Sequence, residues 1–177
     1  IVTITATLGE RAVENTIYVV GGLNNDQVAC RIDGKLTTTA TDFSLTTGNN
    51  GEIIVETAFK ANATYSPALI LKNLADKATY EALIANGYTH LTFNLKVEGD
   101  VTDLYVFGKQ VSSFPESDGV YVITISIQHI VNHYDTMKTI ATSGNQVGQA
   151  SSLAAKLISW KSPAEDYEKV RNYVFTI

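Results

Sequence analysis

A polar loop near the C-terminus holds the residues best suited to bind a ligand. Residues 143–152 read SGNQVGQASS and are mainly small, hydroxyl and amide residues. Amide groups both donate and accept hydrogen bonds, so several of them together suit a ligand that carries hydroxyl groups. From this loop and the segment after it we select as hydrogen-bonding candidates Asn145, Gln146, Gln149 and Lys161.

The only tryptophan, Trp160, is the candidate for an aromatic platform. We expect a strand over residues 153–160 in which Lys156 and Trp160 share a face. Lys161 follows directly, which favours a partly exposed indole. Such an indole suits a sugar ring, whose C–H groups stack on it while the hydroxyls meet polar groups. Tyr167 supplies a second platform. The alternative is that Trp160 fills a gap between a sheet and a helix, because tryptophan is highly buried on average.

Two histidines, His129 and His133, lie four residues apart in a segment that we expect to be helical, so both can point the same way. A zinc site needs three or four ligands, and this pair supplies two. The residues between them include no glutamate, which a His-Glu-x-x-His zinc protease requires. We therefore expect a surface helix here and no metal site.

Other catalytic patterns in the sequence are weak. A glycosidase needs two carboxylates that flank the bond to be cleaved. The carboxylates available for this lie in polar turns, where solvation alone explains them: Asp100, Asp103, Glu116, Asp118, Glu165 and Asp166. The sequence contains neither a Gly-x-Ser-x-Gly elbow nor a phosphate-binding loop ending in Gly-Lys-Ser/Thr. We expect that the chain is not an enzyme.

Two oxygen-rich turns are candidates for a structural calcium ion. They contain Asn24, Asn25 and Asp26 in one case and Asn49, Asn50 and Glu52 in the other. Calcium prefers such oxygen ligands, but ordinary turn chemistry explains the same residues. We expect no cofactor, with a structural calcium as the alternative.

The composition narrows the classes of partner. The 177 residues are 45% hydrophobic and 18% charged, with a formal net charge of −5, which is typical of a globular chain. The 13 lysines and arginines are scattered, so we expect no nucleic-acid binding. The apolar runs are too short to cross a bilayer, so we expect no membrane insertion. Cys30 is the only cysteine, and we expect a small buried side chain there.

The length of the chain predicts one domain, residues 1–177. The chain begins at Ile1, and its only methionine is Met137. We therefore expect a module of a larger protein, with the other domains of that polypeptide as partners. We expect the module itself to be a monomer.

The elements that must position the candidate residues are mostly strands. Two helices are expected, one over about residues 74–86 with Asn73 as its cap and Gly87 after its end, and a weaker one over about residues 128–139. Many strands with two short helices favour an all-β antiparallel sandwich. Alternating apolar and polar residues of β-branched and aromatic types predict strands over residues 2–8, 15–20, 27–32, 35–45, 53–59, 68–71, 90–98, 103–107, 110–114, 120–127, 153–160 and 172–177.

Residues 66–99 carry a family resemblance. They are expected to form a short apolar strand, a helix that ends at Gly87–Tyr88, and the strand LTFNLKVEG. One face of that strand is apolar and consists of Leu91, Phe93, Leu95 and Val97. This order resembles the jelly-roll carbohydrate-binding modules of secreted bacterial polysaccharide-degrading proteins. In those modules a GY-x-x-LTF strand is followed by irregular strands and a returning strand such as residues 172–177. The resemblance covers residues 66–177.

The resemblance implies a jelly-roll β-sandwich that binds a polysaccharide without catalysis, in an extracellular or cell-surface bacterial protein. No ligand-binding residue of that family maps onto this chain, so the expected glycan site rests on the exposure reasoning for Trp160 and on the polar groups near it. The alternative is a structural or adhesive β-sandwich spacer of a surface protein. A glycoside-active enzyme domain is the third possibility.

Overall fold

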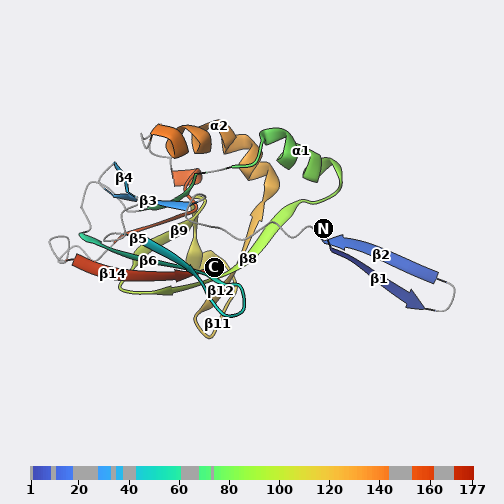
Figure 1. The fold of residues 1–177 in the computed structure, drawn as a ribbon, viewed down its shortest axis with the longest axis horizontal. Coiled ribbons are helices and arrows are strands. Elements are labelled where there is room, and N and C mark those ends of the chain that lie inside the picture. The colour runs from blue at the N-terminus through green and yellow to red at the C-terminus, as the bar shows by residue number, and fades with distance from the viewer. Residues whose placement is uncertain are drawn as a thin grey trace.

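The computed structural model of the chain describes residues 2–8, 11–17, 28–32, 35–37, 43–60, 68–72, 74–143, 153–161 and 170–177. Side chains are described within residues 44–58, 68–72, 74–142, 153–161 and 170–177. Within these limits the chain forms two six-stranded antiparallel sheets, a two-stranded hairpin and two α-helices. The expected antiparallel all-β sandwich with two helices is therefore confirmed (Figure 1).

We call the two large sheets the inner sheet, which lies next to the helices, and the outer sheet, which lies on the far side of it (Figure 1). The inner sheet has the strand order β10-β9-β13-β7-β3-β4. Its strands are β3 (Val28–Ile32), β4 (Lys35–Thr37), β7 (Ala68–Leu71), β9 (Thr102–Val106), β10 (Lys109–Gln110) and β13 (Ile158–Lys161).

The outer sheet has the order β11-β12-β8-β14-β6-β5. Its strands are β5 (Phe43–Thr47), β6 (Ile53–Lys60), β8 (His90–Glu98), β11 (Glu116–Ser117), β12 (Val120–Ser126) and β14 (Val170–Thr176). The hairpin consists of β1 (Val2–Leu8) and β2 (Arg11–Ile17). In its register Val2 lies opposite Ile17, and Leu8 lies opposite Arg11. Successive strands alternate between the two sheets in two parts of the chain. From β6 to β9, and again from β12 to β14, each strand lies in the sheet opposite to that of the strand before it.

Aromatic side chains join the two sheets. Trp160 of β13 lies with its ring centroid 5.5 Å from that of Tyr173 and 4.5 Å from that of Phe175, both in β14. All three side chains have no exposed surface. Because β13 belongs to the inner sheet and β14 to the outer sheet, these rings form the centre of the sandwich core.

The outer sheet has one buried and one exposed face, as its sequence predicts. Along β8 the side chains of Leu91, Phe93, Leu95 and Val97 are half-buried or buried, and the residues between them are exposed. Directly opposite on β12, Ile123 pairs with Phe93 and Ile125 with Leu91. The period of two thus marks the face that packs on the inner sheet.

The helices cover the inner sheet. Helix α2 (Ile127–Ser143) follows β12 without a loop and buries one stripe of side chains, and this stripe consists of Ile130, Tyr134, Met137 and Ile140. Helix α1 (Lys77–Ala85) packs on α2 through Tyr80 and Tyr134. The hydroxyl of Tyr134 donates to the carbonyl oxygen of Ala75 at 2.9 Å. Neither described helix has the length and apolar character of a membrane span.

The C-terminal end of α1 is formed as its sequence predicts. The residue expected as its N-terminal cap is not among the described residues. Gly87 has a φ of 87°, and its N–H donates to Ile84 while the N–H of Tyr88 donates to Leu83. These two bonds form a Schellman motif, as the glycine predicts. The helix begins at Lys77, after Asp76. Asn73, which we expected to cap it, lies outside the described residues.

Four expected strands differ in the structure. Val111–Ser113 is a 3₁₀ turn instead of a strand, because the N–H of Phe114 bonds back to Val111 and the hydroxyl of Ser113 to Gln110. The strand expected over residues 153–160 starts only at Ile158. The strand expected over residues 35–45 is divided between the two sheets as β4 and β5. The hairpin register also places β2 at Arg11–Ile17 instead of residues 15–20.

We expect Trp160→Ala to lower the free energy of unfolding by about 3–5 kcal/mol, because it empties the centre of the core. Urea unfolding followed by far-UV circular dichroism measures this. Val122→Ala is the control, since Val122 is 40% exposed, and we expect it to cost less than about 0.5 kcal/mol. In the unaltered chain, the fluorescence of Trp160 should resist quenching by iodide. A loss below about 1 kcal/mol, or strong quenching, would contradict this packing.

Candidate functional site

Trp160 is not an exposed platform, so that part of the expected glycan site is wrong. The indole has no exposed surface and cannot stack on a ligand in this structure. Its strand, β13, lies between β9 and β7 in the middle of the inner sheet. Lys156, which we expected on a wet face with Trp160, is only 6% exposed, and Ser159 only 2%. Both faces of this segment are therefore covered.

Among the residues whose side chains are described, no phenylalanine or tyrosine is fully exposed. Every phenylalanine and tyrosine whose side chain is described is buried or half-buried. Of the expected hydrogen-bonding residues, Lys161 is exposed. The remaining candidates, Asn145, Gln146, Gln149 and Tyr167, lie outside the described residues. Their roles stay predictions.

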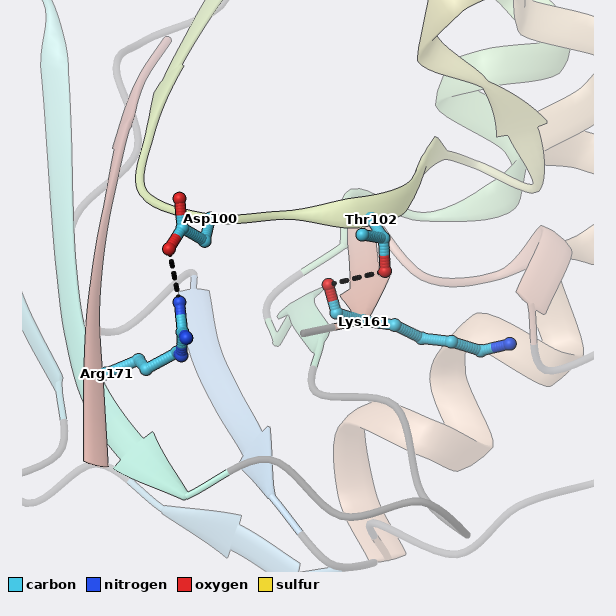
Figure 2. A network of polar contacts seen from close by, with 4 residues as sticks. All are labelled: Asp100, Thr102, Lys161 and Arg171. Atoms are coloured by element: carbon cyan, nitrogen blue, oxygen red, sulfur yellow. Dashed lines mark hydrogen bonds and ion pairs between the residues drawn. The ribbon is translucent and has the colours of Figure 1, made fainter. Parts of the chain in front are cut away.

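Polar side chains from four segments lie near the end of β13 and form two separate ion pairs. We call Asp100, Thr102, Asp103, Lys161 and Arg171 the Lys161 cluster. They come from the turn after β8, from β9, from the end of β13 and from β14. Arg171 Nη1 forms an ion pair with Asp100 Oδ2, and Lys161 Nζ lies 3.2 Å from Asp103 Oδ2. In Figure 2 Arg171 reaches toward Asp100, whereas the Lys161 side chain extends the other way.

Backbone geometry fixes the positions of these side chains. The hydroxyl of Thr102 donates to the carbonyl oxygen of Lys161 at 3.3 Å (Figure 2). The β9–β13 register is irregular between Ser159 and Lys161, and Asp103 has a φ of 47°, a region in which aspartate is enriched. These features hold Lys161 and Asp103 on the rim next to the buried Trp160.

The charges of the Lys161 cluster balance, with two carboxylates against two cations. In the Lys161–Asp103 pair each side chain is about half exposed, at 49% and 47%, and exposed pairs of this kind stabilise a fold by only about 0.2–1 kcal/mol. Their carboxylate oxygens and ammonium protons can still bond to further groups. Exposed groups of this kind are able to form hydrogen bonds with hydroxyl groups.

The two histidines form the second candidate site. Their ring centroids lie 4.4 Å apart. The Nε2 atom of His129 lies 2.9 Å from the carbonyl oxygen of Ala154, and the ring of Phe107 contacts that of His129 with centroids 6.1 Å apart. Burial lowers the pKa of His133 below its usual 6.5, and the neighbouring His129 lowers it further. Burial and the neighbouring imidazole thus both disfavour the charged form of His133.

The oxygen-rich turn at residues 49–52 is organised by its own hydrogen bonds. Glu52 Oε2 accepts a bond from the N–H of Asn50 at 3.0 Å, and Glu52 Oε1 accepts one from Asn50 Nδ2 at 2.9 Å. These bonds lower the pKa of Glu52. Both carboxylate oxygens thus have partners within the turn, which favours turn chemistry over a calcium site here. The turn at residues 24–26 lies outside the described residues.

Comparisons with protein-family models, with curated proteins and with solved structures find no match to this chain. The resemblance to carbohydrate-binding modules therefore stays a prediction.

Sequence reasoning missed Arg171 as a site residue. It lies 71 positions from Asp100, and no local pattern connects the two. The pairing of β14 with β8, in which Val174 lies opposite Glu98, brings them together. Asp100 and Asp103 did stand out in the sequence, but only as carboxylates in polar turns.

We expect Gly99→Ala to destabilise the fold more than Gly119→Ala does. Both glycines have a positive φ, 120° and 78°, which alone costs an alanine about 1–2 kcal/mol. A Cβ on Gly99 would also lie 2.8 Å from the carbonyl oxygen of Asn172, whereas one on Gly119 would meet no atom within 4 Å. Urea unfolding of both variants measures the difference. Equal losses would contradict the close approach of Gly99 to Asn172.

We expect His133 to titrate below pH 6.5, and NMR of its ring protons measures this. Because its pKa is lower in the folded than in the unfolded chain, its contribution to stability is complete above about pH 6.5 and is lost as the pH falls through the folded pKa. His129→Gln should move the pKa of His133 back toward the usual value. A pKa at or above 6.5 in the unaltered chain would contradict the packing of the pair.

Proposed function

We propose that this chain is a non-catalytic β-sandwich module that acts as a structural or adhesive spacer in an extracellular or cell-surface protein. The observation that carries the proposal is the packing of Trp160 against Tyr173 and Phe175. The aromatic residue that the sequence offered as a ligand platform serves instead to join the two sheets. A module of this kind needs a stable core more than it needs a cleft.

The finer fold proposal is a jelly roll. It is supported by the way in which the longer strands alternate between the inner and the outer sheet from β6 to β9 and from β12 to β14. In such a topology almost every connection crosses the sandwich, so that the two sheets fold together. The proposed unit is the single domain of residues 1–177, with other domains of a longer polypeptide as neighbours.

The second candidate function is non-covalent binding of a polysaccharide, and the exposed Lys161 cluster favours it. Here hydrogen bonds would replace aromatic stacking as the main source of affinity. Lys161 offers an ammonium group, and Asp100 and Asp103 offer exposed carboxylates. The second candidate function also includes the other residues that the sequence predicts as ligand-binding, which are Asn145, Gln146, Gln149 and Tyr167.

Affinity electrophoresis through gels that contain soluble polysaccharides separates the two functions. For a spacer we expect the mobility of the chain, relative to a non-binding protein, to be the same with and without each polysaccharide. Retardation that Lys161→Ala or Tyr167→Ala abolishes would overturn the spacer proposal and support polysaccharide binding. Lys138→Ala is the matched control, because Lys138 is an exposed lysine on α2 outside the cluster. Retardation that persists in both test variants would overturn the spacer and place the glycan site elsewhere.

A further inference from the structure

The rings of His129 and His133 lie side by side on the surface of α2. The two residues are one helical turn apart, with ring centroids at 4.4 Å and an angle of 43° between the ring planes. Both side chains are half-buried, so the rings are held by the protein but still reach its surface. Two imidazoles in this arrangement can approach one ion from the same side.

A hydrogen bond determines which ring nitrogen of a neutral His129 carries the proton. The carbonyl oxygen of Ala154, 2.9 Å from Nε2, can only accept, so Nε2 carries the proton and Nδ1 keeps its lone pair. Histidines that bind metals almost always donate their other N–H to a carbonyl or carboxylate in this way. His129 thus has the kind of second partner that a metal ligand requires.

The segment that contains Ala154 packs closely against Phe107 and Gly108. The N–H of Phe107 bonds to the carbonyl oxygens of Lys156 at 3.0 Å and Leu157 at 3.3 Å. Gly108 approaches so closely that a Cβ there would lie 3.0 Å from the Cα of Ala154. The buried ring of Phe107, 4% exposed, also meets His129 edge-on. The orientation of the His129 ring is therefore set by packing as well as by the hydrogen bond.

His133 supplies a second imidazole. Neither of its ring nitrogens has a hydrogen-bond partner among the described residues. In the same described part of the chain, no third histidine, cysteine, aspartate or glutamate joins the pair. From the described residues an ion bound here would receive two imidazole ligands, and water can fill further positions.

We propose that His129 and His133 form a two-imidazole site for a late first-row divalent metal ion, Cu²⁺, Ni²⁺ or Zn²⁺. Imidazole suits these metals, and Cu²⁺ should bind most tightly among them. His129 binds through Nδ1 while its Nε2–H stays on Ala154. The expectation from the sequence, which took two histidines as too few, changes because water can complete an open site.

Isothermal titration of the full chain with Cu²⁺ and with Zn²⁺ at pH 7.5, in a buffer that does not chelate metals, tests the site. We expect one ion per chain and a loss of affinity of about tenfold or more in His129→Gln and in His133→Gln. His90→Gln is the matched control, because His90 is the third histidine and lies on β8, where its Nδ1 bonds to Thr89 Oγ1. Affinity equal to that of the unaltered chain in either test variant, or an equal loss in His90→Gln, would overturn the proposal.

A measurement on the unaltered chain tests the site without variants, so that its result does not depend on whether the variants fold. Substoichiometric Cu²⁺ should broaden the NMR signals of His129 and His133 before those of His90. Electron paramagnetic resonance of the same sample should show coupling of the copper to two nitrogens. First broadening at His90, or a spectrum without nitrogen coupling, would overturn the proposal.

Discussion

The contact of Trp160 with Tyr173 and Phe175 is the interaction on which the rest of this structure depends. β13 and β14 are interior strands of their sheets, each paired on both sides. Packing their aromatic rings together therefore sets the distance and the alignment of all the other strands. Lys161, the residue after Trp160, is exposed, whereas the side chain of Arg171 is only 19% exposed and pairs with Asp100.

Both faces of the inner sheet are covered, whereas the outer sheet has one exposed face. This difference explains why buried residues are consecutive in β7 and alternate in β8. β7 buries three successive residues, Ala68, Leu69 and Ile70, because helices cover one of its faces and the outer sheet covers the other. β8 has only one covered face and alternates. The same helical layer carries the histidine pair and presses it against the segment that contains Ala154. The covering of the sheet thus also creates the second candidate site.

Both candidate sites join segments that are distant in the chain. Asp100 meets Arg171 across 71 positions, and His129 meets Ala154 across 25. Neither pair leaves a local signal, since each depends on strand register or on the packing of a helix against a turn. The sequence predicted Lys161 as a hydrogen-bonding residue. It predicted no metal site at His129 and His133, and it explained Asp103 by solvation alone. It did not predict which of their atoms would find partners.

The sequence by itself determined the local periodicity of this protein. The alternation in residues 90–98 and 120–126, and the glycine after α1, required only steric and solvation preferences that act over a few residues. The burial of Trp160 was decided by the tertiary structure alone. A strand of apolar and polar residues has two faces, and which of them is wet depends on what packs against each. For β13 the outer sheet covers one face and the helices cover the other, so a residue beside a lysine became the centre of the core.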